Sequence, residues 1–174
     1  MESKTIYKMF SESDYNKVLF VMKVLSKKGG ALYEKVVKVE PTRTGSRLIA
    51  LDKNRIYAVE IGAKVEPGFY QPQVTKDFVK FADPIPNVFY PTVKGLLDGK
   101  LKFSIDAKDY STNSEMVAVL CKDLVTQVGE IIDIKYLNDL PKEKKWDVYS
   151  HEGNHKPVVF KTKDYSLAFA PMAA

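Results

Sequence analysis

The sequence predicts an α+β protein dominated by antiparallel sheet. Three features support this class. One segment near the N-terminus has apolar residues at helical spacing, many short runs are rich in β-branched and aromatic residues, and Gly, Asn, Asp or Pro separate these runs. Of the 174 residues, 45% are hydrophobic and 28% are charged, which is typical of a globular protein.

The first half opens with a strand-like alternation over residues 4–10. Ser11 and Asp14 then form a capping-box pattern, so we expect a helix that runs to Lys28, where two glycines end it. The apolar face expected for this helix has i, i+3, i+4 spacing and comprises Tyr15, Val18, Leu19, Met22 and Leu25.

The rest of the first half is expected to form strands joined by turns at residues 43–45 and 52–54, and the strands span residues 32–42, 46–52 and 55–63. Residues 75–82 are amphipathic and predict one or two helical turns. Residues 83–93 contain three prolines, which fix φ and lack an N–H donor, so this segment is expected to be an ordered connector.

The second half is again rich in strand-like runs, which cover residues 100–106, 115–121, 129–134, 146–150, 157–162 and 164–172. A short helix is expected at residues 135–142. The chain therefore predicts two halves, residues 1–82 and 99–174, joined by a connector at 83–98. A single compact composite domain is the alternative.

Residues 151–155 spell H-E-G-N-H, the pattern of zinc proteases. That chemistry needs a helix, because two histidines four residues apart then share one face and bind one Zn²⁺. Gly153 and Asn154 favour a turn instead, and both flanking runs favour strands. A third ligand would have to be a carboxylate such as Asp164. We therefore predict a β-hairpin, with no metal site and no cofactor.

Cysteine content, hydrophobicity and net charge indicate in which compartment the protein is expected and which partners it could bind. Cys121 is the only cysteine, so the chain cannot form an internal disulfide, and a reducing cytoplasm is expected. No apolar run approaches the ~20 residues of a membrane span, and the N-terminus is too polar for a signal peptide. The net charge of +5 is compatible with a nucleic-acid partner.

Signatures of catalysis are missing from the sequence. It contains no phosphate-binding Walker loop, no G-x-S-x-G nucleophile motif and no Cys–His pair at useful spacing. The acidic residues are scattered rather than grouped as a two-metal site requires. We therefore expect a protein that is not an enzyme and has no catalytic residues.

Several segments together resemble one known family. Within residues 46–61, Ala50, Asp52 and Arg55 match the motif A-T-D-G-H-R-L. Residues 132–140 are similar to I-G-F-N-x-x-Y-L-x-D-x-L, and residues 157–160 are similar to a P-v-x-i strand. The tail, residues 164–172, resembles D-Y-x-Y-x-x-M-P-M. These motifs, in this order, resemble the bacterial DNA sliding clamps, the beta subunits of DNA polymerase III.

The resemblance implies a sliding-clamp-like fold, mainly antiparallel sheet with two short helices. The chain is too short for two full clamp domains, and it resembles the first half of one domain joined to the second half of another. Such a short clamp would suit a phage or a mobile element.

The resemblance also implies a function, that of a processivity factor in DNA replication. A homo-oligomeric ring would encircle duplex DNA without reading its sequence and would dock a polymerase or other clamp-binding peptides. The cations expected to face the DNA lie on and after the two helices and are Lys17, Lys23, Lys27, Lys28, Lys142, Lys144 and Lys145, with Lys135 beside the last group. The partner groove implied by the family comprises Leu51, Asn54, Arg55, Ile56, Phe169, Ala170, Pro171 and Met172.

Two other functions stay open at this point. A clamp-fold adaptor would bind a protein partner without encircling DNA. A single-strand nucleic-acid binder would use some of the 10 Tyr and 9 Phe residues for base stacking, although core packing explains most of these rings equally well.

Overall fold

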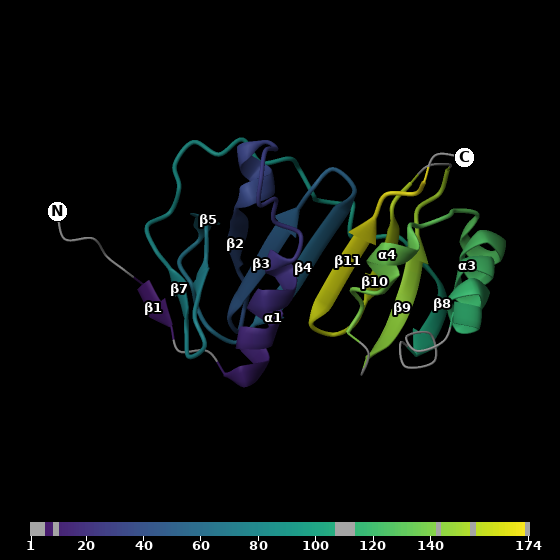
Figure 1. The fold of residues 1–174 in the computed structure, drawn as a ribbon, viewed down its shortest axis with the longest axis horizontal. Coiled ribbons are helices and arrows are strands. Elements are labelled where there is room, and N and C mark those ends of the chain that lie inside the picture. The colour runs from purple at the N-terminus through teal and green to yellow at the C-terminus, as the bar shows by residue number, and fades with distance from the viewer. Residues whose placement is uncertain (1–5, 9–10, 107–113, 142–143, 154–155, 173–174) are drawn as a thin grey trace. The chain divides into compact units, whose positions relative to one another are not determined.

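The computed structural model of the protein describes residues 6–8, 11–106, 114–141, 144–153 and 156–172, without the side chains of 6–8 and 114–117. The chain divides into two compact units, which we call unit 1 (Met1–Thr92) and unit 2 (Val93–Ala174). The boundary falls within the Pro-rich segment that the sequence predicts as a connector. Figure 1 shows the helices and strands of both units.

In its described part, unit 1 combines antiparallel strands with one α-helix and one 3₁₀ helix. Its strands follow the order β5–β2–β3–β4 in one sheet and β1–β7–β6 in the other. The elements in chain order are β1 (Ile6–Lys8), α1 (Glu12–Met22), η1 (Leu32–Lys35), β2 (Val37–Pro41), β3 (Ser46–Leu51), β4 (Arg55–Ile61), β5 (Gly68–Tyr70), β6 (Gln73–Val74) and β7 (Val79–Phe81).

The described part of unit 2 consists of a sheet with the strand order β8–β9–β10–β11, together with helices. All neighbouring strands of this sheet are antiparallel. The elements in chain order are β8 (Lys100–Asp106), α3 (Ser114–Val128), α4 (Ile134–Leu137), β9 (Lys145–Ser150), β10 (Val158–Lys161) and β11 (Tyr165–Phe169). The predicted fold class is therefore confirmed.

The hairpins expected from turn residues and alternating patterns are present. β3 and β4 pair from Ser46↔Ile61 to Leu51↔Ile56, so residues 52–54 form the turn. β9 and β10 pair with Val158 opposite Ser150, which places the segment 151–157 between two strands. The strands predicted at 100–106 and 164–172 correspond to β8 and β11.

Helix α1 begins as predicted but ends earlier. The Ser11 hydroxyl oxygen accepts a hydrogen bond from the Asp14 amide at 3.1 Å, which caps the helix. The helix ends at Met22 rather than Lys28, because the amides after it bond three residues back and the Ser26 amide donates to the Glu34 carbonyl at 2.7 Å. The chain thus leaves the helix to meet η1.

The buried face of α1 also differs from the predicted stripe. Leu19 is 38% exposed, whereas Phe20 and Val21 are buried together with Val18. Phe20 stacks on Tyr57 of β4 with ring centroids 4.9 Å apart. Figure 1 shows α1 lying over the sheet, and it packs on β3 and β4. Packing against β3 and β4 therefore determines which residues of α1 are buried. The spacing of apolar residues in the sequence does not determine this alone.

Asp14 joins α1 to the end of β4 and gives a testable contribution to stability. Its carboxylate accepts hydrogen bonds from the amides of Gly62 and Ala63 at 3.1 and 3.2 Å. Removing a buried acceptor leaves such donors unsatisfied at a cost of about 1–3 kcal/mol. We expect Asp14→Ala to lower the free energy of unfolding by about that amount in urea titrations. Glu12→Ala, an exposed carboxylate on the same helix, is the control, and equal effects of the two changes would contradict this role of Asp14.

Two further segments of unit 1 fold differently from the prediction. Residues 32–35, expected to begin a strand, form the 3₁₀ helix η1. Residues 75–82, expected to be helical, contain a turn followed by β7. The Thr75 hydroxyl oxygen accepts hydrogen bonds from the amides of Asp77 and Phe78, which closes the turn. Pairing of β7 with β1 and β6 then fixes it as a strand.

The largest correction concerns residues 115–121, which were predicted as a strand and belong to α3. Leu120 and Leu124 are buried and lie four residues apart, as on one face of a helix. Gly129, with a φ of 79°, ends the helix, and its amide donates to the carbonyls of Leu124 and Val125 at 3.0 Å. Packing therefore outweighs the strand preference of the two valines, Val117 and Val119, in this segment.

The region after α3 contains less regular structure than predicted. Residues 129–134 were expected to be a strand, but residues 129–133 pair with no strand among the described residues, and Ile134 begins α4. Ile132 is buried there, while Ile131 is exposed. The predicted helix at 135–142 is reduced to α4, whose N-cap Asp133 accepts from the Lys135 amide at 3.0 Å.

Candidate DNA and partner surfaces

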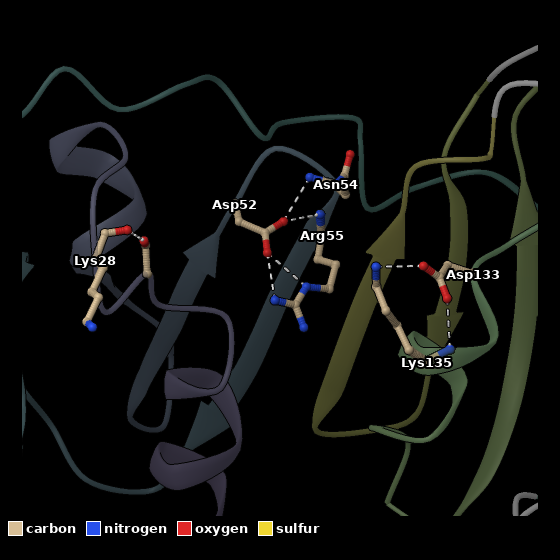
Figure 2. A network of polar contacts seen from close by, with 7 residues as sticks. Lys28, Asp52, Asn54, Arg55, Asp133 and Lys135 are labelled. Carbon is tan, nitrogen blue, oxygen red and sulfur yellow. Dashed lines mark hydrogen bonds and ion pairs between the residues drawn. The ribbon is translucent and has the colours of Figure 1, made fainter.

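Three of the predicted cations of unit 1 lie close together in sequence: Lys23 is the C-cap of α1, and Lys27 and Lys28 lie in the loop that follows. Lys23, Lys27 and Lys28 are exposed. The Lys23 ammonium lies 5.5 Å from the centre of the Phe20 ring. The Lys28 carbonyl accepts a hydrogen bond from the Ser26 hydroxyl at 3.0 Å, which holds this loop (Figure 2). Cations are favourable near a helix C-terminus because the last carbonyls carry partial negative charge.

Lys17, in contrast, does not lie on the exposed face to which the sequence assigned it. Only 8% of the residue is exposed, and its ammonium donates to the Glu60 carbonyl on β4 at 2.9 Å. The apolar stem of a lysine packs readily in such a position while its charged end finds a carbonyl. Lys17 therefore stabilises the contact between α1 and β4 and is no candidate for a phosphate contact.

The predicted cations of unit 2 are placed in two groups. Lys135, on α4, is exposed and forms an ion pair with Asp133 at 2.6 Å (Figure 2). Its hydrogen bond and charge lower the pKa of the Asp133 carboxyl. Lys144 and Lys145, at the start of β9, are exposed. Lys142 lies outside the described residues.

Lys122, on α3, is an exposed cation that was not predicted from the sequence as part of a helix. It was overlooked because residues 115–121 were assigned to a strand that ended just before it. The buried pair Leu120 and Leu124 at helical spacing is the signal that could have found this helix, and with it the lysine.

The turn between β3 and β4, predicted to bind partners, is held by Asp52. One oxygen of its carboxylate accepts from the amides of Asn54 and Arg55, both at 2.8 Å. The other accepts from the Arg55 guanidinium at 2.9 and 2.7 Å (Figure 2). Arg55 also lies over the Tyr57 ring, 5.7 Å from its centre. Desolvation lowers the pKa of Arg55, but the Asp52 carboxylate more than offsets this effect.

The other predicted residues of this turn differ in exposure. Asn54 is exposed, Arg55 and Ile56 are half-buried, and Leu51 is buried at 5% exposure. The turn therefore exposes polar groups to which a partner can bind, whereas Leu51 is buried and belongs to the core of unit 1. The hydrogen bonds to Asp52 hold the Arg55 guanidinium in one position, so its positive charge has a fixed place on this surface.

A pocket of about 340 Å³ lies beside this turn within unit 1. Its wall is formed by the turn and by the segments around the end of α1 and η1, through Val24, Leu25, Ser26, Glu34, Asp52, Lys53, Asn54 and Arg55. The sequence analysis identified two of these residues, Asn54 and Arg55, as partner-binding. It did not identify Glu34, because a single glutamate in a strand-like run carries no signal of its own.

The tail residues lie in unit 2, and the structure separates core from surface among them. Phe169 is fully buried and packs on Tyr136 and Phe160, with ring centroids 5.7 and 5.6 Å apart. It therefore cannot contact a partner directly, contrary to its predicted place in the groove. Ala170 and Pro171 are half-buried.

Met172 forms a small apolar surface with a residue that the sequence analysis did not identify. Met172 is 50% exposed and Ile131 is 49% exposed. The Met172 amide donates to the Ile131 carbonyl at 2.8 Å, so the two residues lie side by side. Ile131 was missed because residues 129–134 were assigned to a strand.

Of the H-E-x-x-H segment, the structure describes residues 151–153, and these three residues are not helical. His151 follows the last residue of β9 directly, and its Nε2 is buried without a hydrogen-bond partner among the described residues. His155 lies outside the described residues. Within the part of the chain that the structure covers, no group of three or more His, Cys, Asp or Glu residues is placed to hold a metal ion. The same part contains no helix long and apolar enough to span a membrane.

Comparison with known proteins adds information on the fold. No protein-family model matches the chain, and no curated protein matches it significantly. Solved structures do match. The DNA polymerase III beta subunit of Thermotoga maritima superposes with a TM-score of 0.66 at 12% identity, covering 100% of this chain and 67% of that chain. The beta chain of Streptococcus pneumoniae gives 0.64 at 11% identity, covering 100% and 66%.

A third structure contains a bound peptide. The Helicobacter pylori beta clamp, solved with a DNA ligase peptide, matches with a TM-score of 0.62 at 10% identity, covering 99% of this chain and 66% of that chain. This chain thus spans about two thirds of the length of the clamp subunits that it matches. The motif resemblance and the superpositions agree on the architecture: the protein has the fold of the DNA polymerase III beta subunits, the sliding clamps.

Proposed function

We propose that the protein is a sliding-clamp-like processivity factor without a catalytic site of its own. In this proposal it encircles duplex DNA in the cytoplasm as a homo-oligomeric ring and docks a polymerase or other peptide-bearing partners. The observation that carries the proposal is the match to beta clamps over essentially the whole chain. A ring that slides needs no reaction chemistry, which agrees with the absence of catalytic motifs from the sequence.

The exposed lysines support the DNA-facing part of the proposal. Lys23, Lys27 and Lys28 in unit 1, and Lys122, Lys144 and Lys145 in unit 2, present ammonium groups to solvent. Lysines make loose contacts with phosphates that do not depend on base sequence, as a sliding protein requires. Lys17 is excluded from this set because its ammonium is used inside unit 1.

Ring closure requires each copy to offer surfaces that pair with another copy. The strand β8 is the outer strand of the unit 2 sheet and is seven residues long. It has a 57% exposed Leu101 and contains no proline. Such an edge pairs readily with a strand from another chain. We therefore assign β8 as one of the surfaces through which copies join.

The docking part of the proposal uses two surfaces, each within its own unit: the polar turn around Asn54 in unit 1 and the apolar pair formed by Ile131 and Met172 in unit 2. Docking peptides use both apolar surface and a few fixed polar groups, and each surface supplies one of these kinds. The H. pylori clamp provides the precedent of a beta clamp with a bound ligase peptide.

Retention on closed circles tests the encircling function. Diluted protein is mixed with nicked circular plasmid, concentrated to allow assembly, and passed through a gel-filtration column that separates DNA from free protein. We expect retention on the circle and loss from the same plasmid after it has been linearised. Light scattering should show an oligomer under the same conditions.

Other outcomes would favour the alternative functions. A monomer at every concentration, with no retention on either DNA form, would reject the ring and favour a protein-binding adaptor. Preferential retention on single strands of either topology would favour a stacking binder. Among the described residues the large buried rings include Tyr57, Phe81 and Trp146, which argues for packing as the role of most aromatics. Phe89, at 89% exposure, is an exception.

A further inference from the structure

A buried carboxylate lies in the wall of the unit 1 pocket without a complete set of partners. Glu34 is only 4% exposed, and its Oε1 has no hydrogen-bond partner among the described residues. A buried acceptor of this kind is costly unless something satisfies it. Glu34 belongs to the lining of a pocket of about 340 Å³, which places this carboxylate beside a space that a ligand could occupy.

Gly30 lies against this carboxylate. A Cβ on Gly30 would meet the second carboxylate oxygen, Oε2, so a larger residue there would displace the Glu34 side chain. Its φ of 78° is also in the left-handed region that favours glycine. The loop after α1 therefore closes against Glu34.

The other carboxylate of the pocket is already satisfied. Both oxygens of Asp52 accept hydrogen bonds, from two backbone amides and from the Arg55 guanidinium. The charges of Asp52 and Arg55 therefore offset each other. Glu34 is left as the acidic group in the wall with an oxygen that lacks a hydrogen-bond partner among the described residues, and Lys53 is an exposed cation in the same wall.

The remaining lining defines which cation fits. Val24 and Leu25 provide apolar surface for a methylene stem, and Asn54 is a polar group in the same wall. One free oxygen suits an ammonium, which is a compact point charge, better than a guanidinium, which prefers two parallel acceptors. The pKa of the neighbouring Tyr33 hydroxyl is raised. Desolvation is the largest cause, and the negative charge of Glu34 is the next.

We propose that this pocket binds a lysine side chain of a protein partner, with Glu34 accepting a hydrogen bond from the ammonium. The protein-partner part rests on the docking function proposed above, since Asn54 and Arg55 of the predicted groove belong to the same pocket. The docking peptide would thus carry a lysine in addition to its apolar residues.

A small-molecule titration tests the pocket independently of any partner. Butylammonium chloride, which matches the end of a lysine side chain, is titrated into the full chain labelled with ¹⁵N, with 1-butanol as the neutral counterpart. We expect saturable shifts of the Ser26, Asn54 and Arg55 amide signals with butylammonium and none with butanol. Glu34→Gln should weaken this binding at least about tenfold, the usual effect of losing a charge-assisted hydrogen bond.

Two further variants keep the test decisive if Glu34→Gln fails to fold. Glu66→Gln removes an exposed carboxylate of the same unit and should leave the binding unchanged. Lys53→Glu removes a positive charge from the pocket wall and adds a negative one, so it should strengthen butylammonium binding severalfold. No saturable shift in the wild type, or an equal response in Glu34→Gln and Glu66→Gln, overturns the proposal.

A peptide series then tests the partner. The ligase peptide of the H. pylori clamp complex is synthesised with lysine or norleucine at each position in turn, and its affinity is measured by fluorescence anisotropy. At one position lysine should bind at least tenfold better than norleucine, and Glu34→Gln should remove that preference. Met172→Lys, which places a cation on the apolar surface, should weaken the whole series.

The two experiments separate the two ideas. Peptides that bind without any preference for lysine overturn the lysine assignment and leave the docking function standing. Butylammonium that binds while no peptide binds overturns the docking function, and with it the protein partner, but leaves the cation preference of the pocket established.

Discussion

Phe169→Ala is expected to lower the free energy of unfolding by about 3–5 kcal/mol, the usual cost of truncating a buried aromatic side chain. Phe169 is fully buried and contacts the rings of Tyr136 and Phe160. The change would leave a cavity where β11, β10 and α4 meet. Urea unfolding followed by tryptophan fluorescence reports on this region, because Trp146 lies on β9 of the same sheet.

Met172→Ala is the matched control for this prediction. It truncates another apolar residue of the same tail, but Met172 is half exposed, so the change should alter stability by less than about 0.5 kcal/mol. Comparable losses from both changes would mean that Phe169 is not the core residue of this tail. The pair thus distinguishes a residue that supports the surface from one that forms it.

Replacing Lys23, Lys27 and Lys28 together by glutamate is expected to have the largest effect on DNA binding. If these three ammonium groups contact phosphates, each releases counterions. The slope of log K against log salt should then fall in magnitude by about 3, close to 0.9 per contact. Affinity at low salt should fall by at least tenfold, equally for unrelated duplex sequences. Fluorescence anisotropy over a salt series measures both quantities.

The control is a triple variant with the same change in net charge at other exposed lysines, Lys64, Lys76 and Lys94. It should change the slope much less, because only contacting charges release counterions. Equal losses in the two triple variants would indicate a general charge effect and remove the end of α1 from the DNA-facing surface. Lys17 is left unchanged in both, since its replacement would disturb the contact with β4.

Several parts of this fold are determined by local sequence. Ser11 predicts the start of α1, because its hydroxyl caps the helix by accepting a hydrogen bond from the Asp14 amide three residues on. This contact is local and needs no residue distant in sequence. The turn at Asp52 also closes on itself, since its carboxylate bonds the amides of the next residues. Runs rich in β-branched and aromatic residues lie on either side of such turns, so β3, β4, β9, β10 and β11 were predicted at nearly their observed positions. The order of these local motifs is what identified the sliding-clamp architecture.

Other features depend on partners that are distant in sequence, and only the tertiary structure decided them. Lys17 is buried because the Glu60 carbonyl, 43 residues away, accepts its ammonium. Residues 115–121 have β-branched side chains but become part of α3, because Leu120 and Leu124 pack as a helical pair. Glu34 becomes a candidate ligand-binding group only when the segment after α1 and the Asp52 turn form a pocket beside it. Intrinsic preferences differ by no more than about 1 kcal/mol per residue, so burial and hydrogen bonding to distant segments outweigh them at such positions.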